Sequence, residues 1–286
     1  MSPEAIALAS SIFYAFCIIS ARRGLKYSTP TTVTFVSLLV HAVTLSAAVF
    51  VTGGIPKVAM KAVILFVIGG SLQPIIRLFT YTGVEKIGAS RSYTLRATAP
   101  LFSAIVAITV LKEQAGAGIM VGTLLIVIGV MFISWEKRQQ RSSYRWWHLL
   151  FPLTAAVLAG IVHPIRRAGL TISDEPLFFA ALVGIVSLFW FVTYLAIPNT
   201  DKPVWNTKAL LPFIAAGFFE TMGILLNISA LSSGRVVVVS PIVSTSPLWV
   251  VFGSVIFLRD LERVSARTIL ASCLVVGGTL TISLAR

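Results

Sequence analysis

The sequence predicts an all-α integral membrane protein in which ten transmembrane helices form two inverted repeats of five helices. Hydrophobic residues make up 57% of the chain and charged residues 12%, with a mean hydropathy of +0.92, all outside the range of soluble domains. Apolar runs of about 20 residues recur along the chain, and a run of that length crosses a bilayer as a helix. The segment 81–113 also recurs, in degraded form, at 228–260.

The apolar runs define the predicted helices and the boundary between the repeats. The predicted helices cover residues 4–22, 31–52, 61–83, 89–111, 115–135, 147–168, 175–197, 209–231, 235–258 and 265–284. The longest polar connection, 136–146, separates a first repeat at 1–135 from a second at 147–286. Because each repeat has an odd number of helices, the second enters the membrane upside down relative to the first.

Aligning the two repeats pairs residues of similar chemistry. With a shift of 147 residues, the pairs are Gln73 with Glu220, Thr80 with Asn227, Pro100 with Pro247, Lys112 with Arg259, and Glu113 with Asp260. The first predicted helix aligns with the sixth, which pairs Arg22 with Arg167 and Gly24 with Gly169. Paired repeats in membrane proteins usually flank a substrate site near the bilayer midplane.

The fourth helix of each repeat ends in a common pattern of a proline, ten residues, a hydrophobic residue, a basic residue and an acidic residue. The pattern runs from Pro100 to Lys112-Glu113 and from Pro247 to Arg259-Asp260. Over nearly the whole chain, this arrangement resembles the EamA-like repeats of the drug/metabolite transporter superfamily. The resemblance implies a secondary transporter with cytoplasmic termini and a central cavity lined by helices 1, 3, 4, 6, 8 and 9. Family members commonly carry Gly-Glu where this chain has Lys-Glu and Arg-Asp.

The distribution of charge and the motifs of the sequence argue against nucleic-acid binding, metal or cofactor chemistry and ATP-driven transport. The net charge of +13 comes mostly from Lys and Arg in short segments between apolar runs, which indicates membrane topology and not nucleic-acid binding. The loops after helices 1, 3, 5, 7 and 9 are the more basic, which places both termini outside the cell (inner) membrane, against the family precedent. Cys17 and Cys273 lie in apolar runs and are interpreted as packing residues. No catalytic residue, metal site or cofactor is predicted, and without a phosphate-binding loop for ATP, transport is expected to use a gradient.

Glu220 is the acidic residue predicted to lie deepest in the membrane, at the centre of the eighth helix. Burying a charge there costs at least ~2.5–3.5 kcal/mol, so a carboxylate at this position indicates a structural or functional role. One interpretation is a proton-coupling group, with His163 as a second candidate. The other is a structural pair between Glu220 and Arg77, which follows the repeat mate Gln73 by one helical turn.

The remaining candidates point to an anionic or zwitterionic substrate, because a guanidinium matches a carboxylate or phosphate in geometry. The predicted substrate-binding residues are Arg96, Arg77, Gln73, Tyr93, Tyr14, Asn227, Ser240 and Ser244. Alternatives stay open: Arg96 extends to a helix end, His163 is satisfied structurally, and His41 is a hydrogen-bonded interface residue. The second and seventh helices, which are rich in Val, Leu and Phe, are predicted to face lipid, including Phe178, Phe179, Phe189, Trp190 and Phe191.

Taken together, these features predict a secondary active transporter that moves a small organic metabolite, favouring an amino acid or organic anion, by alternating access. The alternative within transport is a multidrug-type or lipid-linked-substrate carrier that binds cations through Glu220. Outside transport, the alternative is a membrane scaffold or receptor. The expected partners are a small-molecule substrate, the lipid bilayer, a coupling proton or ion and, in a homodimer, a second copy of the chain. No nucleic-acid partner is expected.

Overall fold

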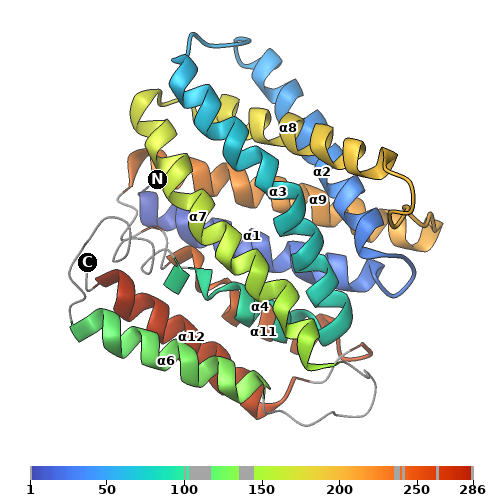
Figure 1. Cartoon of the computed structure of the whole chain (residues 1–286), viewed down its shortest axis with the longest axis vertical. Coiled ribbons are helices and arrows are strands. Elements are labelled where there is room, and N and C mark those ends of the chain that lie inside the picture. Colours follow the sequence, from blue (N-terminus) through green and yellow to red (C-terminus); the bar gives the residue numbers. More distant parts are fainter. Residues whose placement is uncertain are drawn as a thin grey trace.

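Figure 1 shows a computed structural model of the chain, which describes residues 2–99, 101–102, 117–134, 145–234, 239, 242–261 and 264–284. Within these residues the regular structure is entirely helical. The helices are α1 (Pro3–Gly24), α2 (Pro30–Val51), α3 (Met60–Ile87), α4 (Ala89–Arg96), α6 (Ala117–Ser134), the 3-10 turn η1 (Trp146–Leu149), α7 (Leu150–Ile172), α8 (Pro176–Ala196), α9 (Thr207–Ser233), α11 (Ser246–Phe257) and α12 (Ala266–Leu284).

Six helices of the described chain are long and apolar enough to cross a membrane. They are α1, α2, α3, α7 together with η1, α8 and α9. Their ends follow local chemistry, because α1, α2 and α8 each begin at a proline, whose missing N–H and fixed φ suit the first helical turn. The Ser2 and Thr29 side chains accept hydrogen bonds from the Ala5 and Thr32 amides in the first turns that follow them. These helices match six of the predicted segments.

The fourth and ninth predicted helices differ from their expected continuous ranges. Of the expected 89–111, α4 covers only Ala89–Arg96, and residues 97 and 98 form a turn. Of the expected 235–258, α11 covers only Ser246–Phe257, with a turn at 244–245 before it. The first break fits the sequence, because the ring of a proline at position 100 clashes with the carbonyl of Arg96, four residues earlier. Pro100 itself, and residues 103–116, lie outside the described residues.

The long helices pack in reciprocal pairs that follow the alignment of the two repeats. Helix α1 packs most extensively against α9, and α7, which aligns with α1, packs against α3, which aligns with α9. The aligned pair α2 and α8 pack against each other, as do α6 and α12. Figure 1 shows α2 and α8 toward one end of the molecule, α6 and α12 side by side at the other, and α1, α3, α7 and α9 between them. The buried apolar clusters join these four central helices to the inner faces of α2 and α8.

Two aligned glycines let the central helices approach closely. A Cβ added at Gly169 in α7 would lie 2.6 Å from the ring of Phe66 in α3. A Cβ added at Gly24 in α1 would collide in the same way with the ring of Phe213 in α9. Because Phe66 and Phe213 also align with each other, the two contacts are equivalent in the two repeats, and each requires a residue without a side chain.

Two aligned arginines donate hydrogen bonds to carbonyls in the last turns of α3 and α9. The Arg22 Nη1 donates to the Glu85 carbonyl at 3.3 Å, and the Arg167 Nη1 donates to the Leu231 carbonyl at 2.5 Å. The last carbonyls of a helix have no partner within the helix and carry its negative dipole end, so a cation there satisfies and stabilises them.

The prediction that the second and seventh helices face lipid is wrong for one side of each helix. In α8, Phe189 and Trp190 are exposed as expected, but Phe179 and Phe191 are buried. Phe179 stacks on Phe66 with ring centroids 4.2 Å apart. Helix α2 likewise buries His41 and packs against both α8 and α9. Runs of Val, Leu and Phe do not distinguish lipid from a protein neighbour, since both are apolar.

Candidate functional site

Glu220 forms the centre of a buried polar network between the two repeats. Its Oε1 lies 2.9 Å from the Nε of Arg77, which reaches across from α3. Its Oε2 accepts a hydrogen bond of 2.5 Å from the Tyr81 hydroxyl, one turn after Arg77. The Cys17 sulfur of α1 lies 3.5 Å from the Tyr81 hydroxyl oxygen. Both carboxylate oxygens of Glu220 therefore have a partner from α3.

The other two nitrogens of Arg77 contact side chains of α2. Its Nη1 donates to the Ser37 hydroxyl at 3.0 Å, and its Nη2 lies 2.6 Å from the Nδ1 of His41. The Nε2 of His41 lies 3.0 Å from the Ala180 carbonyl of α8. Since a guanidinium only donates and a carbonyl only accepts, His41 is neutral and carries its proton on Nε2. Arg77 is thus held by three side chains, as in the structural-pair interpretation, and His41 is a hydrogen-bonded interface residue.

A second buried arginine, Arg166, reaches α3 from α7. Only 4% of its surface is exposed, and its Nη2 donates to the Gln73 Oε1 at 2.9 Å. Its Nε has no hydrogen-bond partner among the described residues. The sequence places Arg166 near the end of the sixth predicted helix, 147–168, and also counts it among the charges of the following connection. Helix α7 is continuous through Pro164 and ends at Ile172, so both arginines lie inside it.

Tyr14, Tyr93 and Arg96 complete the polar cluster from α1 and α4. Each is half-buried. Tyr14 is close enough to interact electrostatically with Arg166, Glu220 and Arg96, and Tyr93 with Tyr14 and Arg96. Tyr14 therefore lies near the arginines of both α4 and α7, and Tyr93 lies near that of α4.

Of the other predicted site residues, three are described by the structure and one is not. His163 lies one turn before Arg166, and its Nδ1 is buried without a partner in the described chain. Asn227 is buried in α9, and its Oδ1 also lacks a described partner. Ser244 is half-buried in the turn before α11, and Ser240 lies outside the described residues.

Sequence reasoning missed Arg166, Tyr81 and Ser37 as members of the polar cluster. The spacing of Arg77 and Tyr81 by four residues was a usable signal, because it places both side chains on the face of α3 that carries Gln73. Ser37 could not have been found in this way, since its partner Arg77 lies on another helix.

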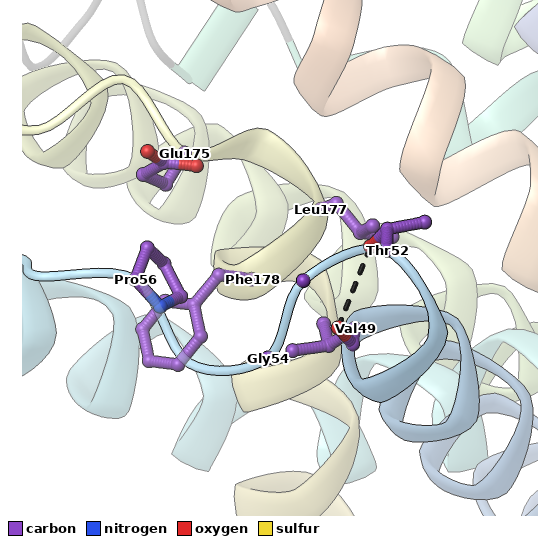
Figure 2. A pocket seen from close by; sticks show the side chains of 8 residues that line it. Val49, Thr52, Gly54, Pro56, Glu175, Leu177 and Phe178 are labelled. Carbon is purple, nitrogen blue, oxygen red and sulfur yellow. Dashed lines mark hydrogen bonds between the residues drawn. The ribbon is translucent and has the colours of Figure 1, made fainter.

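A separate pocket of about 190 Å³ opens where α2 ends and α8 begins, as Figure 2 shows. The pocket is lined by Val49, Thr52, Gly53, Gly54, Pro56, Glu175, Leu177 and Phe178. Gly53 and Gly54 have positive φ angles of 134° and 82°, a conformation that glycine adopts without strain. None of the predicted site residues lines this pocket, so it is distinct from the polar cluster.

Comparison with known proteins decides the family. The family model of the EamA-like transporter family matches residues 1–135 and 145–284. The chain belongs to the EamA-like transporter family. It is therefore a multi-pass membrane protein with a membrane-transporter domain. No match is found among curated proteins.

A solved structure described as "Crystal structure of protein" has the same fold. It matches with a TM-score of 0.65 over 99% of this chain and 96% of that chain. At 12% sequence identity, the likeness establishes the fold of this EamA-like transporter and nothing about its substrate.

Proposed function

We propose that this EamA-like transporter is a secondary active carrier that moves a small organic metabolite, an amino acid or organic anion, by alternating access. The observation that carries the proposal is the charge of the central polar cluster. Its described residues include three arginines, Arg77, Arg96 and Arg166, but only one carboxylate, that of Glu220. An excess of buried positive charge favours a substrate that brings a negative group.

Alternating access is supported by the reciprocal packing of the repeats. Helix α1 packs against α9, and the aligned helix α7 packs against α3. If each repeat adopted the conformation of the other, the cavity would close on one side of the membrane and open on the opposite side. The turns that interrupt the helical path after α4 and before α11 provide points at which these segments can bend. Both breaks lie beside the aligned prolines of the two repeats.

Glu220 is proposed as the coupling residue, with His163 as a second proton-binding group. Protonation of Glu220 removes its negative charge, so Arg77 would lose its ionic partner and the link between α3 and α9 would weaken. Proton binding and the change between access states would thereby be coupled through the ion pair of Glu220 and Arg77. This mechanism requires Glu220 to be deprotonated when the pair with Arg77 is intact.

The membrane and the orientation are proposed from charge. Basic residues gather in the last turns of α1 and α3 and in the loops after α1 and α8, so this side is assigned to the cytoplasmic side of the cell membrane; they are Arg22, Arg23, Lys26, Lys86 and Lys202. This places both termini outside. Labelling an Asn206→Cys variant with a membrane-impermeant thiol reagent tests the assignment, because that loop should react only in inside-out vesicles. Reaction in intact cells would reverse the orientation.

The proposed substrate class is tested by thermal unfolding of the purified transporter with lactate, L-leucine, glycerol 3-phosphate or tetraphenylphosphonium. A compound that binds only the folded state adds ~2.7 kcal/mol at 100 times its Kd. Stabilisation by lactate, L-leucine or glycerol 3-phosphate that is lost in Arg96→Gln supports the proposal. Stabilisation by tetraphenylphosphonium alone, lost in Glu220→Gln, would replace it with a cation carrier that binds through Glu220.

A further inference from the structure

Arg166 is a buried cation without a described counter-ion. Its only hydrogen bond within the described chain joins its Nη2 to the neutral amide oxygen of Gln73 at 2.9 Å, while its Nε has no partner. No carboxylate among the described residues is within salt-bridge distance of Arg166. A charge that is 96% buried without a compensating charge is strongly unfavourable, so the site as folded lacks a negative group.

Glu220, which aligns with Gln73 in the other repeat, carries the negative charge that the site of Arg166 lacks. Gln73 and Glu220 are aligned, and each contacts an arginine of another helix: Glu220 forms an ion pair with Arg77, and Gln73 accepts a hydrogen bond from Arg166. At Glu220 the arginine's partner is a carboxylate, which compensates the charge of Arg77. At Gln73 the acceptor is an amide of nearly the same shape, which orients Arg166 and leaves its charge intact.

The surroundings of Arg166 add further positive charge and unpaired polar atoms. Arg96 is close enough to repel Arg166 electrostatically, and Tyr14 interacts with both. One turn before Arg166, the His163 Nδ1 is buried without a described partner. Two mutually repelling guanidinium groups and a tyrosine hydroxyl form a set of donors suited to an oxyanion.

We propose that Arg166 binds the negative group of the substrate, a carboxylate or phosphate, and that Gln73 sets the charge class of the substrate by remaining neutral. This assignment rests on the proposed function, which supplies the organic anion. Arg166 is the binding residue. Gln73 is a positioning residue that acts through Arg166, because its amide holds the guanidinium without neutralising it.

Three variants separate this role from a structural one: Gln73→Glu, Gln73→Met and Arg166→Gln. The Kd values for lactate and glycerol 3-phosphate are measured from thermal unfolding, with lactamide and glycerol as matched uncharged probes. Ser71→Ala, which removes a hydroxyl bonded within α3, is the control variant. Gel filtration and the unfolding temperature without a probe report whether each variant folds.

We expect Gln73→Glu to fold at least as stably as wild type and to raise the Kd of the binding anion at least tenfold, because the new carboxylate neutralises Arg166. Gln73→Met should weaken binding less, since it removes a hydrogen bond and adds no charge. Arg166→Gln should raise the Kd at least tenfold. Binding by both lactate and glycerol 3-phosphate assigns a general oxyanion site, and binding by one assigns the carboxylate or the phosphate as the recognised group.

A structural role for Gln73 predicts the reverse order, because glutamate keeps the acceptor and methionine removes it. Anion binding that is weaker in Gln73→Met than in Gln73→Glu would therefore overturn the inference while leaving the proposed function intact. If Gln73→Glu does not fold, an unchanged Kd in Arg166→Gln would overturn it instead. Binding of tetraphenylphosphonium but of neither anion by the wild-type protein would show that the proposed function itself has failed.

Discussion

The carboxylate of Glu220 lies 2.9 Å from the Nε of Arg77, so an ion pair joins the two repeats inside the apolar core. Both side chains are almost fully buried, with 11% and 1% of their surfaces exposed. Removing one partner of such a pair leaves a buried charge without compensation. The same pair is the proposed coupling element, so its structural and functional roles must be measured separately.

We predict that Arg77→Met and Glu220→Leu each lower the free energy of unfolding by about 3–5 kcal/mol, because each leaves the partner charge unpaired. The double variant should lose less than the sum of the two single losses, since it buries no lone charge. Denaturant unfolding in detergent micelles measures all three. Additive losses would show that the two residues are not energetically coupled in the folded protein.

A second prediction concerns the aligned glycine contacts. Gly169→Ala should destabilise the protein by about 1–3 kcal/mol, because the new methyl group meets the buried Phe66 ring. Gly277→Ala is the matched control: its Cβ would meet no atom within 4 Å, so the change should be neutral or add up to ~1 kcal/mol of helix propensity. Unfolding temperatures measure both, and equal losses in the two variants would contradict the packing argument.

The two faces of α8 should respond differently to truncation. Phe179 is buried and stacked on Phe66, so Phe179→Ala should cost about 3–5 kcal/mol through lost burial and a residual cavity. Phe189 is 63% exposed, so Phe189→Ala should change stability far less. Unfolding of both variants in the same micelles checks the contrast. Similar losses would mean that Phe189 is buried against a second copy of the chain.

The aligned arginines at the ends of α3 and α9 give a further prediction. Arg167→Gln should lower stability by about 1.5–3 kcal/mol, because it removes a charged donor from the last carbonyls of α9. Lys208→Gln, on the exposed first turn of the same helix, should stay within about 0.5 kcal/mol of wild type. Hydrogen exchange should also show faster opening at the end of α9 in Arg167→Gln. Unchanged exchange there would argue against a capping role.

Sequence alone determined the class, the repeat and the family. A bilayer accepts only helices or closed barrels, so long apolar runs fix the secondary structure with little ambiguity. The alignment of Gln73 with Glu220 and of Gly24 with Gly169 needed only a shift along the chain. These signals are local or periodic, and six of the predicted segments match membrane-length helices of the described chain.

Tertiary structure decided which polar groups meet. Whether Arg77 serves a substrate or Glu220 depends on the distance between α3 and α9, which no spacing in one helix encodes. The burial of Arg166 within α7 and its hydrogen bond to Gln73 became visible only once α7 packed against α3. In a chain whose lipid-facing and core-facing residues are equally apolar, hydropathy cannot assign helix faces, so the partner of each buried charge is set by packing.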